Sequence, residues 1–240
     1  MQLAPGLHRL GNDIIAVHLV VTDEGITVID TGLPGHHADL RRELAAIGRP
    51  MSDIRGVVLT HGDSDHRGFA ERLRRELGVP VLVGAGDADR TRGAKPPATP
   101  KDAMRIGPTL GFFAYAARKR GFRVPPVREV LPVDDGDVLD LPGAPRVIGM
   151  PGHSPGSIAI LVPAVRAVFV GDELTTRSVL TGVSGPQPAP FTDDQATSSA
   201  SLDRLLGLDV DWVVPGHGAP WHGDADSLVT AYRQAEATRR

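Results

Sequence analysis

Four histidines of this chain stand where a metal site would need them, directly after apolar, strand-like runs or inside Gly/Pro turns. His61 and His66 belong to the segment THGDSDH, His153 to PGHSPGS, and His217 to PGHG. Asp172 also follows an apolar run. Loops at the edge of a rigid sheet are where metal-binding and catalytic groups concentrate. Any one of these histidines alone would more often be an ordinary surface or core side chain, but together the five residues predict one metal site.

The first segment has the spacing His-x-Asp-x-Asp-His, which supplies nitrogen and oxygen ligands from His61, Asp63, Asp65 and His66. In an extended chain, alternate residues point to the same side. Positions 61, 63 and 65 then share one side, and His66 turns toward a second position as the next helix begins. One loop could therefore serve two metal ions.

The elements that must position these side chains are strands and helices intermixed along the whole chain. Apolar runs of strand length occur at residues 14–21, 26–29, 57–59, 79–83, 147–150, 158–162, 167–170 and 213–214. Stretches with helical spacing occur at about 36–47, 65–77, 194–206 and 224–237. An Asp-Glu-Gly turn at 23–25 joins two β-branched runs as a hairpin. This mixture predicts an α/β or α+β fold.

The chain also contains an internal repeat. In the first half a predicted hairpin ends in VIDTG, a helical stretch follows, and the unit closes with DIRGVVLTH at 53–61. In the second half a hairpin ends in FVGD, another helix follows, and the unit closes with DVDWVVPGH at 209–217. Two copies of one hairpin–helix–strand unit imply two similar halves packed face to face. The strand-end Asp and His of both halves would then meet at one edge.

Composition narrows the classes of protein. The 240 residues include no Cys, which excludes a disulfide scaffold, a thiolate nucleophile and thiolate metal ligands. The net charge of −3 does not indicate a nucleic-acid binder. No stretch approaches the roughly 18 apolar residues of a membrane span, and the start, MQLAPGLHRLG, lacks the features of a signal peptide. We therefore expect a cytoplasmic protein without a membrane span or a nucleic-acid partner.

Residues 84–128 differ from the rest of the chain. They contain six prolines, four of the ten aromatic residues, and ten Lys/Arg against three Asp, a local charge of +7. We interpret them as a basic aromatic insertion with helices at about 101–106 and 109–120, interrupted at Gly107-Pro108. Three roles stay open for it: a solvated helix that covers the fold, a lid that attracts anionic or acyl substrates, and a helix at a membrane surface.

Taken in order, these motifs resemble those of the metallo-β-lactamase-fold hydrolase superfamily over nearly the whole chain. That family has a strand-end Asp, a His-x-His-x-Asp-His loop, a lone His in a Gly-His-[Thr/Ser]-Pro-Gly-Ser turn, a bridging Asp and a late His. The matching residues here are Asp30, the 61–66 loop, His153, Asp172 and His217. The resemblance implies an α+β fold, an αββα four-layer sandwich of two packed mixed β-sheets flanked by helices. It also implies a single domain over residues 1–240 that carries the basic segment as an insertion.

The resemblance assigns two divalent metal ions, with zinc as the most common choice. The ligands would be His61, Asp63 and His153 at site 1 and Asp65, His66 and His217 at site 2, with Asp172 bridging the two. Asp30 would hold a ligand histidine by a hydrogen bond, although it could simply cap the following turn. Asp65 and Asp172 are the expected catalytic residues, because they would orient a metal-bound hydroxide and accept a proton.

Position 63 departs from the family pattern, because Asp63 replaces the usual histidine. A carboxylate is a harder, charged ligand, and it shifts the preference from zinc toward manganese or iron. Three carboxylates and one hydroxide would neutralise two divalent ions, whereas the usual pattern leaves one positive charge. A neutral cluster is a weaker Lewis acid and acidifies its bridging water less. Asp63 therefore leaves the metal identity and the occupancy of site 1 open.

We expect the substrate pocket to be formed by Phe112, Phe113 and Tyr115 of the insertion, because a bare metal edge offers little apolar surface. His222 could also line this pocket, since it closely follows the last motif. The remaining histidines have no ligand-like context and are expected to be structural: His8, His18, His36 and His37. Asp193-Asp194 is expected to cap a helix rather than bind metal.

The expected activity is hydrolysis of a small-molecule ester, lactone or thioester by a metal-bound hydroxide. No Ser-His-Asp triad and no phosphate-binding or dinucleotide-binding glycine motif is recognisable, so the metals must supply the nucleophile. Three alternatives stay open: a single-iron oxygenase of the same superfamily, a phosphodiesterase, and a catalytically degenerate binding protein. β-Lactam hydrolysis is less expected, because such enzymes usually act outside the cytoplasm. The sequence does not determine whether the chain forms a homodimer.

Overall fold

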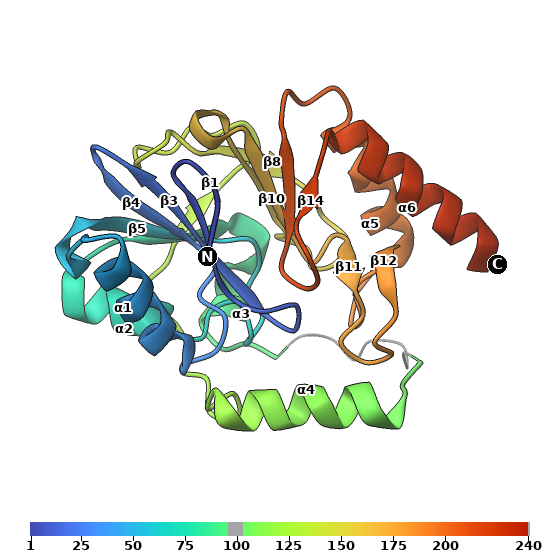
Figure 1. The fold of residues 1–240 in the computed structure, drawn as a ribbon, viewed down its shortest axis with the longest axis horizontal. Coiled ribbons are helices and arrows are strands. Elements are labelled where there is room, and N and C mark those ends of the chain that lie inside the picture. Colours follow the sequence, from blue (N-terminus) through green and yellow to red (C-terminus); the bar gives the residue numbers. More distant parts are fainter. Residues whose placement is uncertain (96–102, 240) are drawn as a thin grey trace.

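The computed structural model describes residues 1–95 and 103–239, which form two β-sheets packed face to face (Figure 1). The larger sheet has seven strands in chain order: β1 (Gln2–Ala4), β2 (Leu7–Gly11), β3 (Ala16–Thr22), β4 (Gly25–Ile29), β5 (Ile54–Leu59), β6 (Val81–Gly84) and β7 (Leu131–Val133). The other sheet has five strands, in the order β14 (Trp221–His222), β13 (Trp212–Pro215), β10 (Ala167–Gly171), β9 (Ile158–Val162) and β8 (Arg146–Gly149). A separate hairpin joins β11 (Thr175–Arg177) to β12 (Ser184–Gln187).

Helices cover the outer faces of both sheets. On the seven-stranded sheet, α1 (His36–Ala46) and α2 (Ala70–Leu77) bury leucines against the apolar side chains of β4 and β5. On the five-stranded sheet, α6 (Ala225–Arg239) and the turn after α5 (Gln195–Ser201) bury a second apolar cluster. A further cluster lies between the sheets, with Ile29 and Val58 from one sheet and Ile160, Phe169 and Val214 from the other. These four layers confirm the expected α+β sandwich.

The internal repeat is visible in the topology. β3 pairs antiparallel with β4, and β4 pairs parallel with β5 after α1. In the same way, β9 pairs antiparallel with β10, and β10 pairs parallel with β13 after α5. Directly after β4, Asp30 adopts a left-handed backbone with φ 56°, and Gly171 at the end of β10 has φ 53°. A Cβ at Gly171 would lie 2.4 Å from Thr60 Oγ1, so the second half needs glycine there. This close approach brings the ends of β5 and β10 together.

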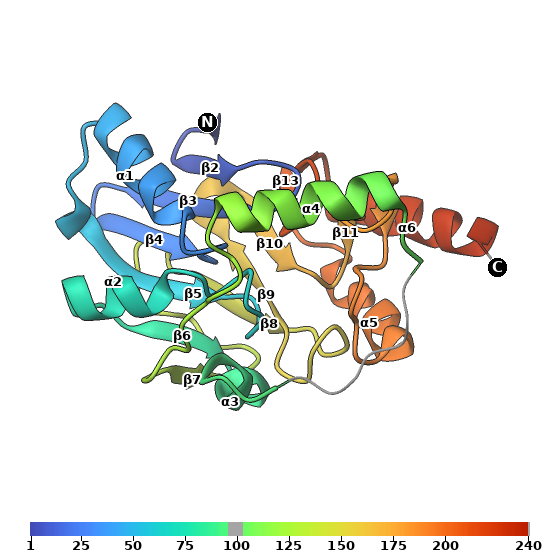
Figure 2. The same ribbon diagram turned by 90° about the horizontal axis from the view of Figure 1, so that it is seen from below.

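The basic segment contributes α3 (Ala88–Thr91) and α4 (Ile106–Arg118). α4 runs beneath both halves of the molecule (Figures 1 and 2). The backbone N–H of Arg105 donates to the Leu180 carbonyl at 3.0 Å, and the N–H of Gly35 donates to the Lys119 carbonyl at 2.8 Å. One end of α4 is therefore fastened to the second half of the chain and the other end to the first half.

The helical boundaries in this segment differ from those expected. Residues 103–105 are not helical, and residues 101–102 of the first expected helix lie outside the described part. The expected interruption at Gly107-Pro108 is wrong, because α4 begins at Ile106 and includes both residues. Proline is tolerated in the first helical turn, where a backbone N–H has no partner within the helix. Among the described residues, no helix combines the length and the apolar character that a membrane span requires.

Candidate metal centre

The four histidines of the sequence motifs converge where β5, β10 and β13 end. His61 follows β5, His66 precedes α2, His153 lies between β8 and β9, and His217 follows β13. All four side chains are buried. The ring centroids of His61 and His66 are 4.0 Å apart, those of His61 and His153 are 4.6 Å apart, and those of His66 and His217 are 5.5 Å apart. One loop of the first half, which carries both His61 and His66, and two loops of the second half therefore meet in one cluster.

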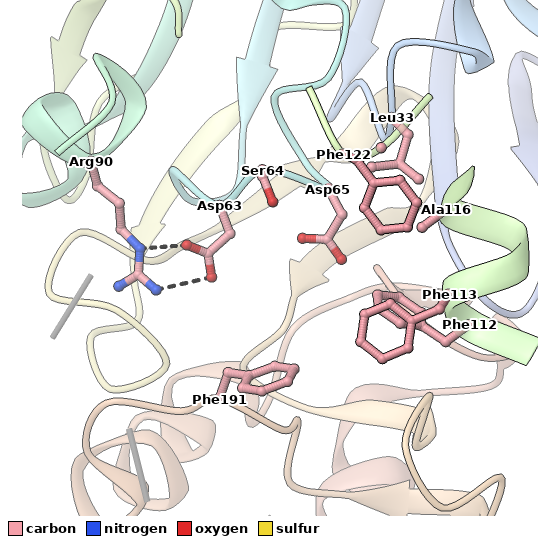
Figure 3. Close-up of a pocket in the computed structure, with 11 residues that line it drawn as sticks. Leu33, Asp63, Ser64, Asp65, Arg90, Phe112, Phe113, Ala116, Phe122 and Phe191 are labelled. Carbon is pink, nitrogen blue, oxygen red and sulfur yellow. Dashed lines mark hydrogen bonds and ion pairs between the residues drawn. The ribbon is translucent and has the colours of Figure 1, made fainter. Parts of the chain in front are cut away.

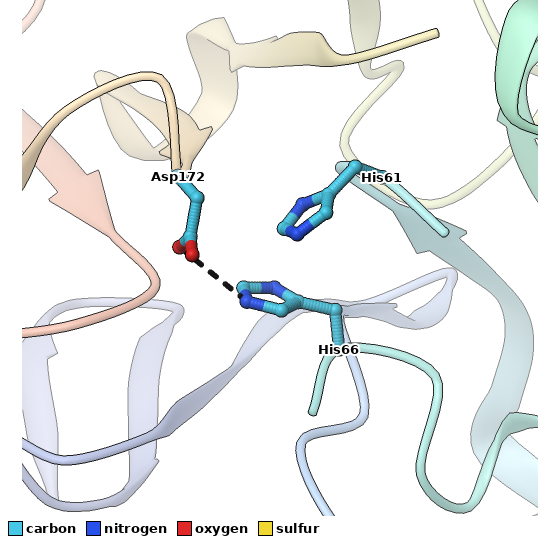
Figure 4. A group of neighbouring side chains, drawn as sticks. All are labelled: His61, His66 and Asp172. Atoms are coloured by element: carbon cyan, nitrogen blue, oxygen red, sulfur yellow. Dashed lines mark ion pairs between the residues drawn. The ribbon is translucent and has the colours of Figure 1, made fainter. Parts of the chain in front are cut away.

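Three groups of side chains in this cluster could hold a cation, and within each group the ligand atoms lie within 4.8 Å of one another. The groups are His61, Asp63 and His153; Asp65, His66 and His217; and His61, His66 and Asp172. The first two have the composition expected for site 1 and site 2. Asp172 lies between them: its Oδ1 is 3.4 Å from His66 Nε2 (Figure 4). Its Oδ2 is 3.1 Å from His217 Nε2. The same Oδ2 is 3.9 Å from His153 Nε2, so Asp172 faces both sites.

Asp30 orients two of the histidines from behind. Its Oδ2 lies 3.0 Å from His66 Nδ1 and accepts a hydrogen bond from Thr60 Oγ1 at 2.8 Å. Thr60 Oγ1 also lies 3.1 Å from His61 Nδ1. Asp30 thus holds His66 directly and His61 through Thr60. A partner at Nδ1 fixes the ring and its tautomer, and leaves Nε2 as the atom that faces the centre.

The other two histidines are anchored in the same manner by different partners. His153 Nδ1 lies 3.1 Å from Thr192 Oγ1, and His217 Nδ1 donates to the carbonyl of Ile14. Several buried atoms that face the centre have no hydrogen-bond partner in the described part of the chain, namely Nε2 of His61, His66 and His153 and Oδ1 of Asp172. Buried polar atoms are rarely left unpaired. A set of such atoms aimed at one point fits a bound cation.

The charges of the cluster shift its pKa values in opposite directions. Burial disfavours protonation of His217, but Asp172 outweighs burial and raises the pKa of His217 to about 9. Against the same effect of burial, Asp172 and Asp30 raise the pKa of His66 well above its ordinary value. Burial and the neighbouring histidines lower the pKa of His61 well below that value. Despite its burial, Asp172 has a pKa held far below its usual range by the facing histidines.

Asp63 is held differently from the other candidate ligands. Its Oδ2 lies 3.4 Å from His153 Nε2 and 3.7 Å from His61 Nε2. Both of its carboxylate oxygens also accept hydrogen bonds from Arg90 (Figure 3). Arg90 in turn donates to Asp193 at 2.8 Å. Burial alone would raise the pKa of Asp63, but the two histidines and the guanidinium hold it below its usual range. Asp63 is therefore an anion shared between site 1 and Arg90.

Two residues that follow β6, Asp87 and Arg90, were not identified from the sequence. Asp87 is completely buried, and its Oδ2 accepts hydrogen bonds from the Gly62 N–H at 2.6 Å and from Ser154 Oγ at 2.8 Å. Its Oδ1 accepts from the Gly156 N–H at 2.9 Å. Asp87 thereby ties the β5 loop of site 1 to the turn between β8 and β9. Their position could have revealed both residues, because functional groups gather at the carboxyl ends of parallel strands.

An apolar cavity of about 360 Å³ opens beside the centre (Figure 3). Its lining consists of Leu33, Asp63, Ser64, Asp65, Arg90, Phe112, Phe113, Ala116, Gly121, Phe122 and Phe191. Phe112 and Phe113 of α4 are thus in the cavity, as the sequence predicts. Phe122 and Phe191 were not foreseen, because nothing in their local sequence connects them with the metal motifs.

Tyr115 and His222 do not line this cavity, contrary to expectation. Tyr115 is buried, and its hydroxyl lies 2.8 Å from Nε2 of His36, since a buried phenol needs a polar partner. His222 lies on the edge strand β14, where its ring stacks on Trp212 at a centroid distance of 4.4 Å. Of the expected helix cap, Asp194 accepts hydrogen bonds from the first turn of α5, whereas Asp193 binds Arg90 instead.

Comparison with known proteins agrees with this architecture. The model of the metallo-beta-lactamase superfamily matches residues 10–217. The probable metallo-hydrolase YflN of Bacillus subtilis is 27% identical over 236 residues, which are 92% of this chain and 87% of the relative. The hydroxyacylglutathione hydrolase GloC of Haemophilus influenzae is 27% identical over 200 residues, 82% of each chain. The crystal structure of TTHA1623 in a di-iron-bound form is 28% identical, with a TM-score of 0.64 over 94% of this chain and 98% of that one.

Proposed function

The chain belongs to the metallo-β-lactamase superfamily of metallo-hydrolases, and on this premise we propose that it hydrolyses a small-molecule thioester, ester or lactone. The observation that carries the proposal is the set of buried histidine Nε2 atoms, each anchored from behind, that face a shared carboxylate. Histidines that are oriented in this way through Nδ1 present Nε2 as a ligand for a metal cation. A metal centre of this kind can supply the attacking hydroxide that a hydrolase without a protein nucleophile needs.

We propose two divalent ions, one at each site. Site 1 would take His61, Asp63 and His153, site 2 would take Asp65, His66 and His217, and Asp172 would contact both. The di-iron form of TTHA1623 supports a count of two. Nitrogen and oxygen donors suit zinc, manganese or iron, and the carboxylate at position 63 favours the last two. When bound, these ions polarise a carbonyl oxygen and bring the pKa of water close to neutrality.

Asp65 and Asp172 are the proposed catalytic residues. Asp65 lines the cavity, and its Oδ2 is 3.5 Å from His217 Nε2, so this carboxylate faces both site 2 and an incoming substrate. Asp172 offers a second oxygen from the opposite half of the chain. Two carboxylates on either side of the centre could orient an attacking water and accept its proton. Asp30 and Thr60 would keep the histidine rings fixed while this proton moves.

The substrate class is argued from the relatives and from the charge of the cavity. The name of GloC states thioester hydrolysis, and esters and lactones present the same carbonyl to the centre. A phosphodiester fits less well, because in the described part of the chain a single cation, Arg90, lines the cavity, and it is already paired with two carboxylates. We therefore place carbonyl substrates first.

Metal quantification followed by a substrate panel tests the proposal. Purified protein and metal-free protein restored with Zn²⁺, Mn²⁺ or Fe²⁺ would be assayed with an ester, a lactone, a thioester and a phosphodiester. We expect two ions per chain and turnover of a carbonyl substrate. One iron per chain with oxygen consumption would identify an oxygenase instead, and no metal uptake with no turnover would identify a binding protein. His222→Ala, which changes an exposed histidine outside the centre, should retain both ions, whereas His66→Ala should not.

A further inference from the structure

The cavity beside the metal centre collects most of the chain's phenylalanines. Four of the six line it, namely Phe112, Phe113, Phe122 and Phe191. Phe113 remains 49% exposed, Phe122 69% and Phe191 47%. Exposed aromatic side chains gathered in one concave place mark a binding surface, because their apolar area is costly to leave in water.

Phe191 is presented to this cavity by a constrained backbone. Its φ of 63° is in the left-handed region, which is unfavourable for a bulky side chain. The two residues that follow it are fixed to the centre: Thr192 contacts His153, and Asp193 contacts Arg90. The same loop that orients a candidate ligand therefore holds an aromatic ring at the cavity. Strain of this kind persists where the surrounding structure imposes it, and it concentrates at ligand-binding sites.

The cavity offers little to an anionic group. Among the described residues, Arg90 is the one cation that lines the cavity, and both Asp63 and Asp193 already bind it. Asp65 also lines the cavity, but as a candidate metal ligand it adds no group that could bind an anion. Two basic residues at the end of α4 have other partners, since Lys119 pairs with Asp39 and Arg118 lies over the Tyr115 ring. Of the basic residues of the inserted segment that the structure describes, Arg90 alone lines the cavity, and it is already paired.

From these observations we infer that the cavity binds an uncharged, apolar group of the substrate, an aromatic ring or a short acyl or alkyl chain. The inference rests on the proposed hydrolytic function and specifies its substrate. A volume of about 360 Å³ is at the lower end of the roughly 300–1,000 Å³ typical of ligand pockets. The phenylalanines would select by apolar area, and the described lining offers no unpaired cation to a charged thiol such as glutathione.

Two thioesters that share one acyl group provide the first test. We expect kcat/KM to be about tenfold higher for the N-acetylcysteamine thioester than for the glutathione thioester. Two ester series, one lengthened at the acyl group and the other at the alcohol, determine which side enters the cavity. In one of them kcat/KM should rise about two- to fourfold per methylene, mainly through KM, until the cavity is full. Preference for glutathione together with flat profiles in both series would overturn the inference.

Variants locate the effect. Phe113→Ala and Phe122→Ala should flatten the chain-length profile, whereas Leu110→Ala, on the same helix as Phe113 but outside the cavity lining, should not. Phe122→Arg supplies an unpaired cation at the cavity and should shift the preference toward the glutathione thioester by about tenfold. If Leu110→Ala flattens the profile as strongly as Phe113→Ala, the cavity is not where the apolar group binds.

A binding measurement separates failure of this inference from failure of the proposed function. The uncharged fluorescent probe N-phenyl-1-naphthylamine should bind the metal-free protein saturably. Phe113→Ala and Phe122→Ala should weaken its binding, and Leu110→Ala should leave it unchanged. If no thioester, ester or lactone is hydrolysed, the proposed function fails. The probe measurement then decides by itself whether the cavity binds an uncharged apolar group. Equal probe binding by all variants would overturn the cavity assignment even if hydrolysis is observed.

Discussion

The two candidate sites use similar ligands but hold them in different ways. At site 2, Asp30 and a backbone carbonyl anchor His66 and His217 from behind, and the atoms facing the centre remain available. At site 1, both oxygens of Asp63 are already engaged by Arg90. The ligand atoms of site 2 are therefore free to bind a metal cation. At site 1 the carboxylate of Asp63 is shared with the guanidinium of Arg90, which is always positively charged. The extra negative charge expected from a carboxylate at position 63 is partly offset by this guanidinium.

Changing Asp172, the residue that faces both sites, should weaken metal binding at site 1 and site 2 alike. Asp172→Asn removes the carboxylate that faces His66, His217 and His153 and should weaken metal binding at both sites by about 100-fold or more, since even partners that only support ligands contribute 10–100-fold. Calorimetric titration of the metal-free protein with Zn²⁺ measures this. Asp140→Asn, a change of an exposed carboxylate remote from the motifs, is the matched control. A variant that retains one full-affinity ion would show that Asp172 serves a single site.

The pH dependence of metal binding should sharpen the contrast. A histidine must be neutral to bind a metal, so a raised pKa means that binding displaces a proton. At site 2 the pKa of His217 is raised to about 9 and that of His66 is also raised, whereas at site 1 the pKa of His61 is lowered and only that of His153 is raised. Lowering the pH from about 9 to 6.5 should therefore weaken site 2 by up to about tenfold per pH unit for each displaced proton, and site 1 less steeply.

Zn²⁺ titrations across this pH range would use Asp63→Ala to observe site 2 and His217→Ala to observe site 1. Equal slopes would contradict the expected difference. The folding stability of the metal-free protein should change with pH in the opposite direction to its metal affinity, which provides a second check. A raised folded-state pKa of His217 contributes stability that is present below about pH 6.5 and is lost as the pH rises through about 9. The melting temperature of the metal-free protein should consequently fall over this range.

The smallest effect is expected from releasing Asp63. Arg90→Gln removes the charge that lowers the basicity of this carboxylate and repels a cation, so affinity at site 1 should increase about tenfold while site 2 stays unchanged. Asp63→Ala should remove the ion at site 1. In that background, Arg90→Gln should have no further effect on metal affinity. Arg166→Gln, which alters an exposed ion pair, serves as the control. A lower affinity in Arg90→Gln would mean that Arg90 chiefly orients Asp63 for the metal.

The sequence predicts those parts of the molecule whose local pattern is strong. Continuous apolar runs identify the buried strands β5 and β10. The internal repeat relates the half of the chain that contains β5 to the half that contains β10. Short edge strands are missed, because β7 contains a proline and β14 spans only two residues, so neighbours rather than propensity decide their pairing. The start of α4 is misjudged because Pro108 reads as a breaker, although it occupies the first turn.

The same distinction holds at the site. The candidate ligands are recognisable because histidine and aspartate recur in motifs at strand ends. Their partners are not, since Thr60, Thr192 and the carbonyl of Ile14 acquire their roles only through contacts across the fold. Arg90 is separated from Asp63 by 27 positions and a strand, and no local spacing relates the two.

Residues 92–126, which form most of the inserted segment, begin and end side by side in the fold. The backbone N–H of Val127 donates to the Thr91 carbonyl at 3.1 Å. Because these ends already meet, replacing residues 92–126 by a longer or shorter connection changes the closure entropy by only about 0.6 kcal/mol per doubling of length. The segment carries Phe112, Phe113 and Phe122 but none of the candidate ligands. Exchanging this segment would therefore replace three of the four phenylalanines of the cavity while leaving every candidate ligand in place.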